Sequence, residues 1–202
     1  MAAITSSTEH QPVIDPSIYL AKETLKDGTE VTIRAIQPED GAGVLESFAK
    51  LDRDAIYRRF FSLKKELSDA EVKQLTDVDF SQVVALVVTT ETGKGETLIA
   101  GGRYAVENRE TSQAAELAFL TDEAYRGRGI AGLLLRHLIR LAQKAGISRL
   151  KADVLADNHP MLGVFRRSGL PMRQRREGSV IHVALELEPD PSDEFQAAQG
   201  SG

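Results

Sequence analysis

The run Arg126-Gly127-Arg128-Gly129 places two positive charges and two flexible backbone positions directly before a strongly apolar helical pattern. Glycines let a backbone approach a ligand closely, and the first turn of a helix presents unpaired N–H groups and a partial positive charge. Together these features form a binding site for phosphate groups. The sequence therefore predicts an anion site at this junction, in a chain whose net charge is −5.

Glu116 lies on the N-terminal side of this run, within the apolar stretch from Ala114 to Leu120. A free lysine amine has a pKa of about 10.4 and must lose a proton before it can attack an acyl group. A carboxylate can take that proton, and partial burial in a strand would make it a better acceptor. Glu116 is therefore the candidate general base, with Asp153 and Glu107 in reserve, although an ordinary outward-facing strand glutamate has the same pattern.

Elements of two kinds must position these residues. Alternating or continuous apolar patterns predict strands at 29–36, 83–89, 98–106, 114–120, 149–155 and 180–187. Capping signals and apolar residues at helical spacing predict helices that begin at Pro38 and Ser68 and that cover 52–61, 129–145 and 159–168. The three strands in the middle of the chain form a meander, so the order favours an α+β fold over a purely parallel sheet.

Two motifs overlap on the glycines. Gly127, Gly129 and Gly132 satisfy the GxGxxG pattern of dinucleotide-binding sites, and Asp153 follows at about the 20-residue spacing of a ribose-binding acid. However, a polar spacer separates these glycines from the preceding strand, and too little chain follows them for a doubly wound sheet. The sequence context therefore argues against this reading.

The second motif is Arg126-x-x-Gly129-x-Ala131, which is similar to the acetyl-CoA pyrophosphate loop of the GNAT superfamily of N-acetyltransferases. Asn158-His159-Pro160-Met161 and the later pair Gly169-Leu170 resemble the second signature of that superfamily. The resemblance extends from Val31 to Leu187. It implies a GNAT fold, which is an α+β fold with a mixed, mostly antiparallel central sheet flanked by helices on both faces. It also implies acetyl-CoA as co-substrate, and no metal.

The resemblance also implies a role for each site residue. Glu116 corresponds to the catalytic glutamate, and Asn158 would contact the cofactor, although a plain helix N-cap explains it too. The backbone of the next strand would pair with the pantetheine arm and hold the oxyanion, and the glycine loop would hold the pyrophosphate. These cofactor contacts are Phe119, Leu120, Thr121, Arg126, Gly127, Arg128, Gly129, Ile130 and Ala131.

One position departs from the superfamily. Many members have a tyrosine that protonates the leaving thiolate, whereas this chain has Phe165, which has no hydroxyl group. We therefore expect CoA either to leave as the thiolate, since a thiol pKa is about 8.5, or to receive its proton from another donor such as water.

The N-terminal half, from Leu25 to Asp40 and again from Tyr57 to Ser68, most resembles bacterial protein lysine acetyltransferases. This implies that the acceptor is a lysine of a protein such as an acyl-CoA synthetase. Members of that group often carry a further domain, for which this chain of 202 residues is too short. An acetyltransferase of a small-molecule amine and a non-catalytic acetyl-CoA-binding module both remain open.

Composition narrows the remaining classes. The chain contains no cysteine, so it has neither thiolate metal ligands nor an acyl-cysteine intermediate, and the acetyl group would pass directly within a ternary complex. The excess of acidic residues disfavours nucleic acid, and no apolar run approaches the roughly 20 residues that span a membrane. We expect a cytoplasmic protein with tails at 1–17 and 189–202, one domain at 18–188, and surface positions for His137, His159 and His182.

Overall fold

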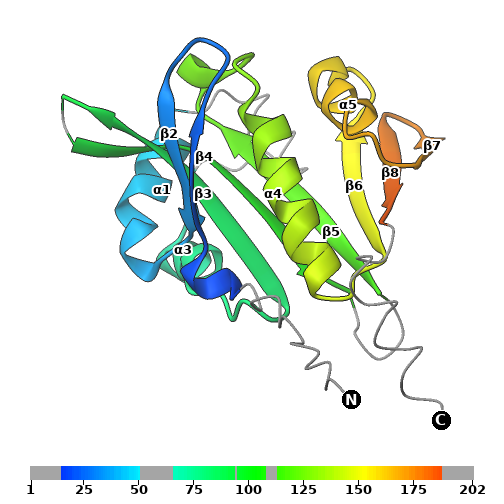
Figure 1. The fold of residues 1–202 in the computed structure, drawn as a ribbon, viewed down its shortest axis with the longest axis horizontal. Coiled ribbons are helices and arrows are strands. Elements are labelled where there is room, and N and C mark those ends of the chain that lie inside the picture. The colour runs from blue at the N-terminus through cyan, green and yellow to red at the C-terminus, as the bar shows by residue number, and fades with distance from the viewer. Residues whose placement is uncertain (1–14, 51–65, 94, 108–112, 188–202) are drawn as a thin grey trace, which may run out of the picture.

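A computed structural model describes residues 15–50, 66–93, 95–107 and 113–187. Its centre is a twisted sheet of eight strands in the order β1-β2-β3-β4-β5-β6-β8-β7 (Figure 1). The strands are β1 Leu20–Thr24, β2 Glu30–Ala35, β3 Val83–Thr92, β4 Gly95–Val106, β5 Ala114–Thr121, β6 Arg149–Leu155, β7 Met172–Glu177 and β8 Val180–Glu186. The helices are η1 Pro16–Ile18, η2 Pro38–Asp40, α1 Gly41–Ala49, α3 Asp69–Thr76, η3 Glu123–Tyr125, α4 Ile130–Lys144 and α5 His159–Arg166.

The sheet is antiparallel except at one junction. β5 and β6 run parallel, and their register holds only from Ala114↔Arg149 to Glu116↔Lys151. β5 and β4, in contrast, pair from Val106↔Ala115 to Ala100↔Thr121. The predicted mixed and mostly antiparallel sheet is confirmed, and the dinucleotide-binding reading of the glycines is wrong because that fold needs a parallel sheet.

Helices cover both faces of the sheet, as expected. α4 lies along β3, β4 and β5 on one face (Figure 1). There Leu134 and Leu138 of α4 and Phe165 of α5 belong to the main apolar core. On the other face α1 and α3 pack beside η2 and β4, around Phe48 and Leu67. The sheet's outer strands, β6, β8 and β7, carry charged side chains on this second face.

Local signals account for most of these elements. The apolar stripe of α4 is buried, and Gly146 after its end has φ +72°, as a terminating glycine does. At the start of α3, Ser68 and Glu71 form the predicted capping box. The predicted meander is β3-β4-β5. The expected helix at 52–61 and most of the two expected tails lie outside the described residues.

Three features were not predicted. β1 and β7 form the two edges of the sheet, and neither contains a buried residue, so neither shows the apolar alternation that identifies a strand. His137 is only 6% exposed and lies between α4 and β1, so the expected surface position is wrong for it.

In the part of the chain that the structure describes, no helix is long and apolar enough to cross a membrane.

Candidate active site

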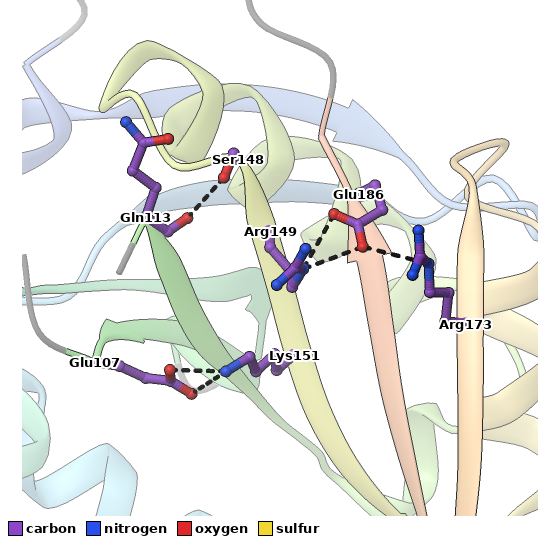
Figure 2. Close-up of polar contacts among 7 residues, drawn as sticks. All are labelled: Glu107, Gln113, Ser148, Arg149, Lys151, Arg173 and Glu186. Atoms are coloured by element: carbon purple, nitrogen blue, oxygen red, sulfur yellow. Dashed lines mark hydrogen bonds and ion pairs between the residues drawn. The ribbon is translucent and has the colours of Figure 1, made fainter. Parts of the chain in front are cut away.

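The site is centred where β5 and β6 separate. After Glu116, β5 keeps its pairing with β4, but no described strand pairs with its other edge from Leu117 to Thr121. Gln113 and Ser148 close the near end of the gap, since the Gln113 carbonyl accepts hydrogen bonds from the backbone N–H and the hydroxyl of Ser148 at 2.9 and 3.3 Å (Figure 2). The two strands therefore part here, and we call this split of the sheet the opening. No described strand pairs with the backbone donors and acceptors of β5 along it, so an extended ligand can add to this edge like a strand.

Glu116 lies at the last register position before this opening. Its neighbours Ala115 and Leu117 are buried in the core on the α4 side, so its own side chain lies on the opposite face of the sheet. Across the two pairings it is level with Ala105 of β4 and Lys151 of β6. The side chain is exposed, so the expected partial burial is wrong: this part of the face is not covered by α1 or α3.

The two reserve acids are already engaged. Both carboxylate oxygens of Glu107 lie close to the Lys151 ammonium, at 2.8 and 3.0 Å (Figure 2). Asp153 accepts a hydrogen bond of 2.7 Å from Nδ1 of His182, the residue opposite it on β8. Of the three acids, Glu116 is therefore the one whose carboxylate the structure leaves pointing toward solvent beside the opening.

Ion pairs stiffen the strands beyond the opening. Glu186 of β8 receives Arg149 Nε of β6 at 3.0 Å and lies 3.7 Å from Arg173 Nε of β7 (Figure 2). Exposed pairs of this kind contribute little to stability individually. Here they link three adjacent strands, of which β6 pairs with β5 only from Arg149 to Lys151.

The glycine loop joins β5 to α4 at the wide end of the opening. Asp122 begins η3 by accepting a 2.9 Å hydrogen bond from the Ala124 N–H, and Ile130, 2% exposed, anchors the start of α4 in the core. Between them Gly127 and Gly129 adopt φ +76° and +93°, which side chains with a β-carbon rarely adopt. No heavy atom lies within 4 Å of a β-carbon placed on Gly127, so the loop backbone is open to its surroundings at this position.

The loop arginines have intramolecular partners. Arg128 Nη1 lies 2.9 Å from Asp27 Oδ2, its Nη2 donates to the Ala124 carbonyl at 2.9 Å, and its guanidinium lies 4.8 Å from the Tyr125 ring centre. Arg126 Nη1 lies 3.8 Å from Glu123 Oε1. Both arginines are near the loop, as predicted, and their contacts with the pyrophosphate stay a prediction.

The hairpin between β1 and β2 was missed as part of this site. Its turn contains Asp27, which contacts Arg128, and Lys26, whose side chain passes beside Gly129. Asp27-Gly28 is a typical turn sequence and could have indicated a hairpin. Nothing local in the sequence could have shown that this turn reaches the loop before α4.

The remaining predicted contacts lie along the same opening. Phe119 of β5 packs edge-to-face on Phe165 of α5, with ring centres 6.3 Å apart, and Phe165 is only 1% exposed. Leu120 points to the other face and packs against the Phe48 cluster. Asn158 caps α5 by accepting a 3.3 Å hydrogen bond from the Met161 N–H, so the N-cap role is present, and its contact with the cofactor stays a prediction.

Comparison with known proteins identifies this architecture. Residues 53–170 match the Acetyltransferase (GNAT) family. The chain is 29% identical over 165 residues to acetyltransferase Pat of Mycolicibacterium smegmatis. The matched residues make up 82% of this chain but only 48% of that protein. It is 30% identical over 139 residues to an acetyltransferase of Pseudomonas aeruginosa, covering 69% of this chain and 74% of that one.

Among solved structures, the GNAT domain of S. lividans PAT superposes with a TM-score of 0.74 at 30% identity, covering 83% of this chain and 97% of that domain. The chain thus spans about half the length of the mycobacterial relative and nearly the whole of the isolated GNAT domain. The chain belongs to the Acetyltransferase (GNAT) family.

Proposed function

We propose that this domain transfers the acetyl group of acetyl-CoA to the side-chain amine of a lysine in another protein, with Glu116 as the general base. The observation that carries the proposal is the position of Glu116. It is an exposed carboxylate on the strand that lines the opening, at the point where β5 and β6 part.

The chemistry follows from that position. The lysine ammonium loses a proton to Glu116, directly or through one water, and its nitrogen then attacks the thioester carbon. A backbone N–H on the free edge of β5 can stabilise the oxyanion that forms. The attacking nitrogen carries a positive charge in this intermediate. When the carbon–sulfur bond breaks, the nitrogen gives its surplus proton to water, and CoA leaves as the thiolate or takes a proton from water, because Phe165 has no hydroxyl group to donate one.

The open face favours a protein as the acceptor. Glu116 lies on the side of the sheet where β6, β8 and β7 carry no described helix, so a folded partner can bring a surface lysine to the carboxylate. Docking would also exclude water from Glu116, which strengthens the attraction between the carboxylate and the lysine cation. An acyl-CoA synthetase is the first partner to test, and such a reaction belongs in the cytoplasm.

The test is acetylation of a purified acyl-CoA synthetase, measured by intact mass after incubation with acetyl-CoA and the enzyme. We expect wild-type enzyme to add acetyl groups and Glu116→Gln to reduce kcat by about 10²–10⁴-fold, the usual contribution of a general base. Glu107→Gln is the matched control, because it removes an equally exposed carboxylate from the same end of the sheet.

Three results would redirect the proposal. Full activity in Glu116→Gln together with a loss in Glu107→Gln or Asp153→Asn would move the base to that residue. Release of CoA with small amines, without acetylation of any protein, would make the domain a small-molecule acetyltransferase. Binding of acetyl-CoA with no turnover of either acceptor would leave a non-catalytic binding module.

A further inference from the structure

The turn of the β1–β2 hairpin is a rigid structure that reaches the glycine loop. Leu25 is 6% exposed and anchors it in the core, and the Leu25 N–H donates to the Thr29 carbonyl at 2.9 Å. Gly28, at φ +85°, donates to the Leu25 carbonyl at 3.0 Å, and Asp27 Oδ1 accepts from the Thr29 N–H at 3.0 Å. The hydrogen bond from Thr29 is the main reason why the pKa of Asp27 is lowered, so this carboxylate is charged at neutral pH.

An ion pair fastens the turn to the loop. Asp27 Oδ2 lies 2.9 Å from Arg128 Nη1, and the contact of the Arg128 guanidinium with the Tyr125 ring helps to keep this group in place. Lys26 then runs across Gly129, the residue directly before α4. Its Cε, Cδ and Cγ atoms lie 3.6, 3.9 and 4.0 Å from the position that a β-carbon on Gly129 would occupy.

The charges around the loop show why Lys26 matters. Arg128 is paired with Asp27, and Arg126 lies near Glu123, so each loop arginine has a carboxylate beside it. Lys26 is exposed and, among residues 15–50, 66–93, 95–107 and 113–187, forms no ion pair. Its ammonium group therefore adds a positive charge that no ion pair with a described acid neutralises, on the side of the loop where α4 begins.

We infer that Lys26 is a phosphate-binding residue of the acetyl-CoA site, supplied by the hairpin rather than by the glycine loop. The ammonium group is a compact cation on a flexible stem, and such groups bind phosphate as point charges. The stem lies on Gly129, and the start of α4 attracts anions, so the cation and the helix terminus act on the same group. Acetyl-CoA offers a pyrophosphate and a 3′-phosphate, and both present this chemistry.

The inference rests on acetyl-CoA as the co-substrate and not on the role of Glu116. Its test is a calorimetric titration with CoA and no acceptor, so an error in the assignment of the base or the acceptor leaves the measurement unaffected. Wild type is compared with Lys26→Met, which keeps the length of the stem and removes the charge. The control is Lys22→Met, which removes an exposed charge from β1 of the same hairpin.

We expect Lys26→Met to raise the Kd of CoA about 10-fold at low salt, which corresponds to about 1.4 kcal/mol of binding free energy. The difference in Kd between Lys26→Met and wild type should become smaller at high salt. Lys22→Met should bind CoA like wild type. Equal affinity for Lys26→Met and wild type would overturn the inference, as would equal losses in the two variants, which would indicate general charge attraction. Urea unfolding of each variant excludes a loss caused by misfolding.

A second ligand distinguishes the two phosphates. With CoA that lacks the 3′-phosphate, a 10-fold difference that persists assigns Lys26 to the pyrophosphate, and a difference that disappears assigns it to the 3′-phosphate. Acetyl-pantetheine lacks both groups, so its binding should not respond to Lys26→Met. A response there would contradict the inference.

Discussion

Gly101 and Gly102, which are adjacent in β4, give the sharpest stability prediction, because side chains placed on them would point to opposite faces of the sheet. A β-carbon on Gly102 would lie 3.0 and 3.2 Å from two ring carbons of Phe119 and 3.3 Å from Leu138 Cδ1. A β-carbon on Gly101 would meet only the Leu86 carbonyl oxygen, at 3.7 Å. Neither glycine has a positive φ, so an alanine is not strained by the backbone at either position.

The magnitudes follow from two opposing effects. Replacing a strand glycine by alanine removes freedom from the unfolded chain and stabilises by about 0.5–1 kcal/mol. Overpacking a core costs about 1–3 kcal/mol. The first effect is common to both positions, so Gly101→Ala should be neutral or stabilising. Gly102→Ala should be less stable than Gly101→Ala by about 1–3 kcal/mol.

Urea unfolding measures this difference, with the slope m unchanged between the two variants so that the midpoints report stability. Because Phe119 lies on the strand that lines the opening and packs on Phe165, Gly102→Ala should also raise the KM for acetyl-CoA, whereas Gly101→Ala should not. Equal midpoints for Gly101→Ala and Gly102→Ala would refute the steric argument, since only the direction of the added methyl group differs.

Two further predictions concern buried or capping polar groups. Nδ1 of His137 accepts a 2.6 Å hydrogen bond from the Tyr19 hydroxyl, and its Nε2 lies 3.2 Å from Glu23 Oε1. Burial lowers the pKa of His137 below its usual 6.5 although Glu23 acts in the opposite direction, so the unfolded chain binds the proton first. The stability that His137 contributes should therefore be complete above about pH 6.5 and decline as the pH falls toward the folded pKa, and urea midpoints of His137→Gln should lack this decline. Asn158→Ala should lower the free energy of unfolding by about 0.5–2 kcal/mol because it removes the cap of α5, whereas Asn158→Asp should keep the cap. If Asn158→Asp raises the Kd for CoA at unchanged stability, the amide contacts the cofactor. If the Kd is unchanged, Asn158 acts only as the cap.

Local patterns were enough to predict the elements around the candidate site. The apolar residues of α4, the glycine after it and the capping box at Ser68 act within a few positions of the chain, so their consequences can be read from the sequence. The meander of β3, β4 and β5 likewise needs only short connections. The family motif then predicted which loop and which strand form the site.

Other features depend on distant partners and could not be predicted in this way. β7 reads as a basic cluster, and it is a strand only because β8 offers it an edge. The sequence pattern places His137 on the polar side of a helix, but Tyr19, just before β1, and Glu23 of β1 cover it in the fold. Glu116 was expected to be partly buried because its neighbours in sequence are apolar, but those neighbours point to the other face. Burial here depends on which helices cover each face.

The geometry of β5 also separates the two charges that the reaction needs. Glu116 should attract a lysine cation, whereas the glycine loop must attract phosphates, and the stretch of β5 from Glu116 to Thr121 is about 17 Å long at about 3.3 Å per residue. That distance exceeds the screening length of about 8 Å at physiological salt. The carboxylate therefore repels the cofactor's phosphates only weakly, while Lys26 and the loop lie too far away to repel the acceptor lysine. We expect Glu116→Gln to lose turnover without losing CoA affinity, and Lys26→Met to lose CoA affinity without losing turnover at saturating acetyl-CoA. Each substitution removes one charge from one end of the proposed site, since Glu116 lies at the start of this stretch of β5 and Lys26 lies beside the glycine loop that follows it.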